Sequence, residues 1–430
     1  MTTPTLFGGF IVAAVLLGCP GAGDREGDAS PAGGEGPRVE AEFIAARNDE
    51  SRERSPATTP RNDESRDGRR PSTAARMEII WQSDDLERPG AMAALDDERI
   101  LVADRYRVHV ITPGGGLLRT IGARSGEGPG EFASIYGVGV TGDTVLVYDV
   151  RTIRLSLLDS TGAFLGSQTL RPHEGFVNPE TRIRLHVHDG HLILPATENV
   201  RTDGIPVRGA FLRYRLGDGS VNTVRAIHGA AWMLLGGDVI GNRQMFGPQA
   251  IMAVGPGGRI AFGEGLEYCV TIEDPVSDVQ RVCHSRPRIP VTDAVRDPPL
   301  EALAQRVELP ESRRQMMRAA VRAQEIGSHR PSYLALMFDD ASRLWVQVVD
   351  QEQAQIHPWM LRYPELRPPH YVWDVFAPDG KHLGEVRLPS GLSPRLITQD
   401  AVYGVYELPS GEQVVARVRM PLPWADGSAR

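Results

Sequence analysis

Cysteine, lysine and long apolar runs are scarce in this chain of 430 residues. Only Cys19, Cys269 and Cys283 supply thiols, and Lys381 is the one lysine among many arginines. The apolar stretch at residues 6–17 is shorter than the roughly 20 residues that a membrane-spanning helix needs. The preference for arginine is attributed to genomic composition, whereas the short apolar stretch fits the core of a signal peptide.

Sequence signatures of common enzymes are also missing. The chain contains no G-x-S-x-G nucleophile elbow, no phosphate-binding P-loop and no H-E-x-x-H zinc motif. Its formal net charge is −8, which argues against a nucleic-acid partner because the phosphate backbone requires a basic protein face. These absences favour a binding protein over an enzyme.

A repeated pattern of short strands organises residues 90–170. An alternating run that ends in aspartate occurs twice, as ILVAD and VLVYD, with Asp104 and Asp149 about 45 residues apart. A repeat of this length that contains only strands is typical of propeller blades. Because one four-stranded blade cannot bury both of its faces, it must stack on neighbours around a ring.

The same pattern continues to the end of the chain and predicts an all-β, six-bladed β-propeller at residues 76–421. The last blade has only three strands of its own, and residues 76–82 are expected to supply the fourth, which closes the ring and removes an exposed sheet edge. The predicted blades lie at residues 90–122, 135–170, 183–227, 250–285, 333–388 and 394–421.

A non-β insertion at residues 291–331 interrupts the series of blades. Its second half has small and apolar residues, from Met316 to Ile326, at helical spacing, and arginines fall on other sides. Gly327 is expected to end this helix. The helix is interpreted as a surface element on a blade edge, with a lid over the channel mouth as the alternative.

The N-terminal region predicts export and a tether. Residues 1–18 read as a signal peptide, and the Leu-Leu-Gly-Cys sequence that ends at Cys19 resembles a bacterial lipobox. Lipidation of Cys19 would anchor the protein in a membrane of the cell envelope, on the periplasmic or outer surface, with secretion as the alternative. Residues 19–75 are too polar to form a core and predict a disordered linker, and residues 422–430 form a short tail.

Several segments resemble a known family. The glycine-rich GEGPGEF at residues 126–132, RLWV at 343–346 and APDGKHLGEVRLP at 377–389 are similar to segments of NHL-repeat propellers, in particular six-bladed bacterial lipoproteins of that type. The resemblance covers residues 76–421. It implies a six-bladed fold and a platform that binds a partner, and it implies no particular reaction.

The GEGPGEF loop is the first candidate binding site. It links two blades on one rim of the ring, where binding residues concentrate on rigid scaffolds. Arg124, Glu127 and Glu131 are the candidate ligand-binding residues. The alternative is a structural corner in which Phe132 fills the space between blades and Glu131 accepts hydrogen bonds from backbone amides.

Three histidines surround the strongest hairpin signal of the chain, Asp189-Gly190. This pair favours a type I′ turn, which places His188 opposite His191, and His186 shares their face of the strand. Three imidazoles on one face could hold a divalent metal such as zinc or copper. The alternative is a polar hairpin tip that faces solvent. Apart from this possible metal ion, the sequence indicates no cofactor, and the cofactor is unknown.

Cys269 and Cys283 are predicted to form a disulfide. A hairpin turn centred on residue 276 pairs the two positions directly, at a separation that a disulfide can bridge, roughly 4.5–5.5 Å between Cα atoms. Export permits oxidation, whereas two reduced cysteines in the blade interior are the alternative.

Taken together, the sequence predicts a non-catalytic binding or scaffold head for a protein or a small ligand. The competing hypothesis is a metal-dependent, lactonase-like hydrolase with its site in the central channel. The side chains that line the channel discriminate between the two. Convergent carboxylate, Asn or His groups would favour the hydrolase, and small residues with unpaired arginines would favour the binding head.

Overall fold

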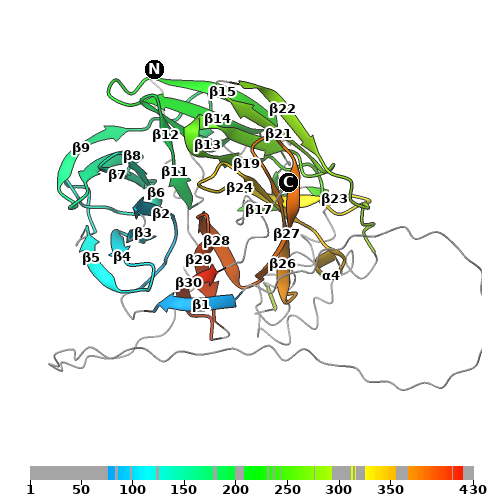
Figure 1. The fold of residues 1–430 in the computed structure, drawn as a ribbon. Helices are drawn as coiled ribbons and strands as arrows, with labels where there is room; N and C mark the ends of the chain where they lie inside the picture. The colour runs from blue at the N-terminus through cyan, green and yellow to red at the C-terminus, as the bar shows by residue number, and fades with distance from the viewer. Residues whose placement is uncertain are drawn as a thin grey trace, which may run out of the picture. The chain divides into compact units, whose positions relative to one another are not determined.

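The computed structural model is a β-propeller in which six sheets, antiparallel apart from one short strand, form a ring (Figure 1). The residues that it describes all belong to one compact unit, Asn62–Arg430. The described residues are 76–82, 86–96, 99–122, 125–177, 182–198, 208–229, 232–235, 238–242, 244–275, 277–292, 311–312, 315, 325–354, 367–408 and 410–419.

Blades one, two, four and five each follow the chain from the centre of the ring outward. Blade one contains β2 (Met92–Asp96), β3 (Arg99–Asp104), β4 (Arg107–Ile111) and β5 (Leu117–Ile121). Blade two contains β6 (Ile135–Thr141), β7 (Thr144–Asp149), β8 (Arg154–Asp159) and β9 (Phe164–Thr169). Blade four contains β19 (Ile251–Val254), β20 (Ile260–Gly263), β21 (Cys269–Asp274) and β22 (Ser277–Cys283). Blade five contains β24 (Tyr333–Phe338), β25 (Leu344–Val348), β26 (His370–Phe376) and β27 (His382–Pro389).

The N-terminal strand closes the ring, as predicted. Blade six consists of β28 (Leu392–Ile397), β29 (Ala401–Glu407), β30 (Gln413–Arg419) and, on its outer edge, β1 (Arg76–Trp81). Met77 pairs with Val418 and Ile79 pairs with Ala416 in the antiparallel register of β1 and β30. The first described strand therefore covers the edge of the last one, which would otherwise expose unpaired backbone groups.

Six apolar clusters hold neighbouring blades together, one at each interface around the ring. At the interface of blades one and two, for example, Leu101 and Val110 pack with Val138 and Val147, and all four are fully buried. The alternating pattern of each strand supplies these residues, because every second side chain points to the same face of the sheet. The core is therefore a ring of shared interfaces.

An aspartate ends the second strand of blades one and two and explains the repeat seen in the sequence. Asp149 is fully buried and accepts hydrogen bonds from the amides of Ala133 and Ser134, at 2.5 and 3.2 Å, in the loop that enters blade two. Asp104 holds the loop before blade one in the same way. Buried carboxylates of this kind fix the entry loops on one face of the ring, because amide donors there need acceptors.

Blade three differs from the prediction at its inner edge. It is built on β13 (His191–Glu198), β14 (Arg208–Arg215) and β15 (Val221–His228), and two short strands, β10 (Phe176–Val177) and β12 (Val187–His188), share the inner edge of β13. The expectation that this blade begins at Ile183 is wrong. Residues Ile183–Leu185 form β11, which pairs in parallel with β6 of blade two.

The insertion also differs from the prediction where it is described. Ile326 belongs to a strand, β23 (Glu325–Ile326), which pairs in parallel with β18 (Gln244–Met245), so it is not the last turn of a helix. Gly327 allows the backbone at this position to lie close to the backbone of Phe246, because a Cβ there would lie 2.8 Å from the carbonyl oxygen of Phe246. The remaining described elements are a hairpin of β16 (Trp232–Leu235) and β17 (Asp238–Asn242), a 3-10 turn at Pro256–Gly258, and α4 (Gln351–Ala354).

Several predictions fall on residues outside the described part. The signal peptide, Cys19, the linker, Arg124, the tail and most of the predicted helix are among them. Within the described part, no helix has the length and apolar character needed to cross a membrane.

Candidate functional site

The GEGPGEF loop is built as a corner between blades one and two. Phe132 is fully buried in the cluster that the two blades share. The Glu131 carboxylate accepts a hydrogen bond from the amide of Gly128 at 3.1 Å. Arg154 of blade two donates to the carbonyl oxygens of Glu127 and Glu131. These contacts agree with the structural interpretation, and a ligand on this rim stays a prediction.

The histidine hairpin has the predicted turn. Asp189 and Gly190 both have positive φ, 48° and 72°, as a type I′ turn requires, and His188 pairs with His191. His191 contacts the carbonyl oxygen of Asp189 at 2.8 Å, and burial lowers the pKa of His186 to about 3. In the described part of the chain these three imidazoles do not form a group with ligand atoms within 4.8 Å, so a metal there has no geometric support.

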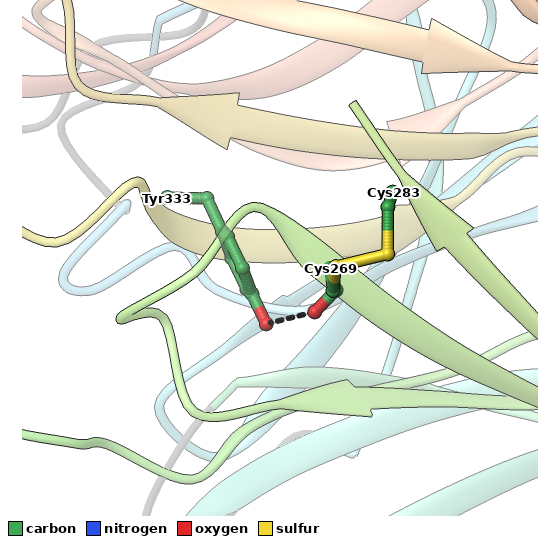
Figure 2. The surroundings of a disulfide bond; sticks show 3 residues. All are labelled: Cys269, Cys283 and Tyr333. Atoms are coloured by element: carbon green, nitrogen blue, oxygen red, sulfur yellow. Dashed lines mark hydrogen bonds between the residues drawn. A yellow bond between two sulfur atoms is a disulfide. The ribbon is translucent and has the colours of Figure 1, made fainter. Parts of the chain in front are cut away.

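A disulfide joins Cys269 and Cys283 across β21 and β22, in the predicted register and with 4.1 Å between the Cα atoms. Figure 2 shows that Tyr333 of blade five lies beside it and donates its hydroxyl to the carbonyl oxygen of Cys269 at 3.1 Å. The disulfide therefore holds one hairpin of blade four where blade five packs on it.

A second inner strand in blade two places arginines near the centre of the ring. Gly137 and Gly139 of β6 lack side chains, and β11 occupies the space that side chains would fill. A Cβ at Gly139 would lie 2.3 Å from the carbonyl oxygen of Leu185. Because β11 contacts both β2 and β28, it lies where the inner strands of three blades meet. Arg182 precedes β11 directly, and Arg184 is in its middle.

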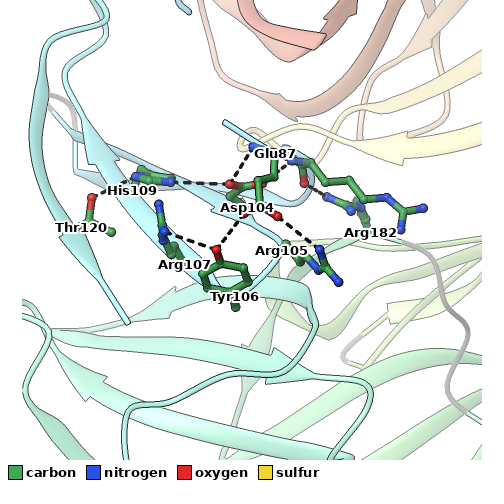
Figure 3. A network of polar contacts seen from close by, with 9 residues as sticks. Glu87, Asp104, Arg105, Tyr106, Arg107, His109, Thr120 and Arg182 are labelled. Atoms are coloured by element: carbon green, nitrogen blue, oxygen red, sulfur yellow. Dashed lines mark hydrogen bonds and ion pairs between the residues drawn. The ribbon is translucent and has the colours of Figure 1, made fainter. Parts of the chain in front are cut away.

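Arg182 is held against the entry loop of blade one (Figure 3). The Asp104 carboxylate accepts hydrogen bonds from the amides of Glu87, at 3.1 Å, and Arg88, at 2.5 Å. Arg182 donates to the carbonyl oxygen of Arg88, and its side chain packs over Gly90, where a Cβ would collide with the guanidinium. The buried carboxylate thus fixes the loop that positions Arg182.

The two other arginines of this region differ in their partners. Arg184 forms an ion pair with Asp340, in the loop that follows β24 of blade five. Arg395, on the inner strand β28, makes no hydrogen bond or ion pair with the residues that the structure describes, and its Nε atom is buried. One of the three guanidiniums is therefore neutralised by a carboxylate, and the two others have no carboxylate partner in the described part of the chain.

The electrostatics of this inner cluster, defined as Arg182 and Arg395, favour a bound anion. Burial, and then the charge of Arg182, lower the pKa of Arg395 to about 10. Burial, and then the charge of Arg88, lower the pKa of Arg182. Both shifts mean that the cationic form is less stable here than in water. A negative group placed between the two guanidiniums would stabilise the cationic form of both.

The sequence contains one signal for this cluster. Alternating glycines inside a strand often mark the close approach of another backbone. Gly137 and Gly139, in the IYGVGV run, are such a pair and predict an additional strand at this edge. The partner segment, Ile183–Leu185, is too short to show a period of its own.

Comparisons with known proteins assign the chain to no family. No family model matches the chain. No curated protein matches it either. It is similar to a solved member of the DUF4221 family from Bacteroides vulgatus, with 12% sequence identity, a TM-score of 0.46 and coverage of 81% of this chain and 96% of that chain.

Two further solved structures are similar to the chain at comparably low sequence identity. One is a Bacteroides fragilis protein assigned as exported, with 11% identity, a TM-score of 0.44 and coverage of 81% and 95%. The other is a virginiamycin B lyase from Staphylococcus aureus, with 8% identity, a TM-score of 0.36 and coverage of 81% and 89%. At these identities and TM-scores the similarities carry no conclusion about the function of this chain.

Proposed function

We propose that the propeller is a non-catalytic binding head whose ligand carries an oxyanion group, held between Arg182 and Arg395 at the centre of the ring. The observation that carries this proposal is that two partly buried guanidiniums, from the neighbouring inner segments at β11 and β28, have no carboxylate partner among the described residues. A protein that only needed a stable core would gain by replacing such an arginine with an apolar residue.

The chemistry of arginine defines the ligand class. A guanidinium presents a planar set of donors that matches the oxygens of a carboxylate, phosphate or sulfate, and hydrogen bonds of this kind are about twice as strong as neutral ones. Two guanidiniums on neighbouring inner strands can both donate to one such group. The group can belong to a small molecule or to an acidic side chain of a protein partner.

The competing hydrolase requires convergent metal ligands on the inner strands. Within the described residues, the group of side chains that could hold a metal lies instead on β26, at the start of β27 and directly after β22, away from the inner edges. The unpaired Arg395 is the feature that favours a binding head. Assays of lactone hydrolysis with added calcium test the competing hypothesis directly.

The proposal includes export and a lipid tether at Cys19. The disulfide of blade four supports an oxidising compartment, because such bonds are rare in the cytosol. Radiolabelled palmitate incorporated by the wild type and lost in Cys19→Ser, together with release of the variant from the membrane fraction, is the expected result. Membrane association that survives Cys19→Ser contradicts the anchor. Assignment to the NHL-repeat type stays a prediction.

Ligand-dependent melting tests the anion site. Phosphate, sulfate, citrate and glucuronate are added to the protein at constant ionic strength, and at least one is expected to raise Tm with a saturating concentration dependence. Arg395→Gln and Arg182→Gln should each weaken that ligand at least tenfold. Arg281→Gln, which removes an exposed charge from the outer strand β22, is the matched control and should bind as the wild type does.

Two results would overturn the proposal. One is a wild-type Tm that none of the four anions shifts beyond the effect of chloride at equal ionic strength. The other is a shift that survives in both Arg395→Gln and Arg182→Gln, because binding would then lie elsewhere. Circular dichroism of each variant confirms that the blades remain folded.

A further inference from the structure

A second cluster of functional side chains lies at the seam between blades four and five. His284 follows β22 directly, Asp374 is in β26, and His382 begins β27. One potential ligand atom from each of the three residues lies within 4.8 Å of the others. These residues belong to two blades and are unrelated to the inner cluster of Arg182 and Arg395.

The backbone around each histidine is fixed. The amide of His284 donates to the carbonyl oxygen of Tyr268 at 3.0 Å, and the disulfide partner Cys283 is its immediate neighbour. His382 pairs with Phe376 in the register of β26 and β27. The two imidazole rings stack, with centroids 4.4 Å apart and an interplanar angle of 27°. Both imidazoles are therefore held in one small space before any ligand enters it.

The Asp374 carboxylate is oriented by hydrogen bonds from two side chains, Tyr268 and Arg286. Tyr268 donates to Oδ2 at 2.5 Å, and Arg286 donates to Oδ2 at 2.9 Å and to Oδ1 at 2.6 Å. A carboxylate oxygen has two lone pairs, so Oδ1 keeps one that these contacts do not use. Tyr268 and Arg286 thus act as outer partners that fix the carboxylate, an arrangement typical of metal sites.

The contact between Asp374 and His382 leaves a polar atom without a partner. The Nε2 atom of His382 lies 3.4 Å from Oδ1 of Asp374, which is too long for a good hydrogen bond. This Nε2 is buried and has no hydrogen-bond partner. A separation near 3.4 Å is what two ligands of one tetrahedral ion have when each bond is about 2.1 Å.

We infer that His284, Asp374 and His382 form a divalent transition-metal site of the zinc class. Two imidazole nitrogens and one carboxylate oxygen are a ligand set that zinc accepts, with water in the open position. The side chain of His382 is about one-third exposed, so an ion and its water can enter from solvent. Because the ligands come from both blades, the ion would also join blade four to blade five.

The positive charge of Arg286 determines the affinity that we expect for the metal ion. Arg286 forms an ion pair with Asp374, the same carboxylate that would bind the ion, and so reduces the attraction of this carboxylate for a second cation. We therefore expect a micromolar dissociation constant for Zn²⁺, weaker than that of closed structural zinc sites. Occupancy is expected to raise Tm, because an ion that binds only the folded state stabilises it.

Calorimetric titration of the chelator-treated full chain with Zn²⁺ tests the inference. One bound ion per chain is expected, and His284→Gln and His382→Gln should each weaken binding at least tenfold. The matched control is the double variant His188→Gln/His191→Gln, which removes the other pair of neighbouring histidines and should bind Zn²⁺ as the wild type does. Both test histidines are partly exposed, so folded variants are expected.

Each other outcome overturns the assignment. Absence of Zn²⁺ binding to the wild type at 100 μM, roughly one hundred times a dissociation constant of about 1 μM, would show that no such site forms. Loss of binding in the hairpin variant, with binding retained in His284→Gln and His382→Gln, would place the ion at residues 188 and 191. Neither result bears on anion binding at Arg182 and Arg395, which is measured separately.

Discussion

Replacing Gly139 by alanine should displace β11 without opening the ring. The new Cβ would lie 2.3 Å from the carbonyl oxygen of Leu185 and 2.7 Å from its Cβ, whereas ordinary contacts begin at 3.4 Å. The three-residue strand therefore has to move away from β6 by about 1 Å. Overpacking of this kind costs about 1–3 kcal/mol.

The assay for Gly139→Ala is urea unfolding followed by fluorescence, together with anion affinity. A loss of 1–3 kcal/mol lowers the unfolding midpoint by roughly 0.3–1 M if the slope is about 3 kcal/mol/M. Anion affinity should fall at least tenfold, because Arg182 is directly attached to β11. Both effects have one cause, so they should appear together.

Gly166→Ala is the matched control for this prediction. Gly166 lies in the outer strand β9, has no positive φ, and has nothing within 4 Å of the position of a Cβ. Its replacement should change stability by at most a few tenths of a kcal/mol or raise it slightly. If Gly139→Ala and Gly166→Ala had the same midpoint and the same anion affinity, β11 would not dock on β6 and the construction of the site would be refuted.

Three further predictions concern stability. Reduction of the Cys269–Cys283 disulfide, which spans 14 residues, should cost about 3 kcal/mol, and a double alanine variant should lose the same amount and then be insensitive to dithiothreitol in urea unfolding. Asp149→Ala removes the acceptor of four backbone amides and should cost about 3 kcal/mol in the same assay, and a loss below 1 kcal/mol would contradict its role. His186 has a folded pKa of about 3, below its unfolded value of about 6.5, so the unfolded chain binds more protons and stability should fall as the pH drops from 6.5 toward 3. His186→Gln should reduce that slope in urea unfolding at pH 7 and pH 5, and an unchanged slope would contradict the lowered pKa of His186.

The ring and its closure could be predicted from the sequence because they depend on period-two patterns. The last blade lacked one strand and residues 76–82 were expected to supply it, so the placement of β1 beside β30 followed, whereas the register of that pair did not. The pairing of Cys269 with Cys283 followed in the same way, since a hairpin turn sets the register of all positions beyond it.

The candidate site could not be predicted because its parts lie far apart in the sequence. Arg182 and Arg395 come from different blades, and only the docking of a three-residue strand brings β11 into contact with β28. The interpretation of the Ile183 segment as part of blade three placed Arg184 in the wrong sheet. Short strands without a period are set by tertiary packing, here by two glycines that leave room for a backbone.

The cluster at the seam between blades four and five could not be predicted from the sequence for the same reason. His284 and His382 lie far apart in the sequence, in different blades, and neither lies in a motif with metal-ligand spacing. The histidine hairpin at residues 186–191 had the better local pattern, but proximity along a strand does not make the three ring nitrogens converge. Convergence depends on side-chain direction, which the strand register fixes only in part.

Anomalous diffraction from crystals of the protein soaked in selenate shows where an oxyanion binds, because selenium marks its position. We expect a peak with selenate oxygens about 3 Å from guanidinium nitrogens of both Arg182 and Arg395, and no peak in crystals of Arg395→Gln. A density map in which Arg395 is paired with a carboxylate of the chain, with no selenium beside it, would contradict the anion site.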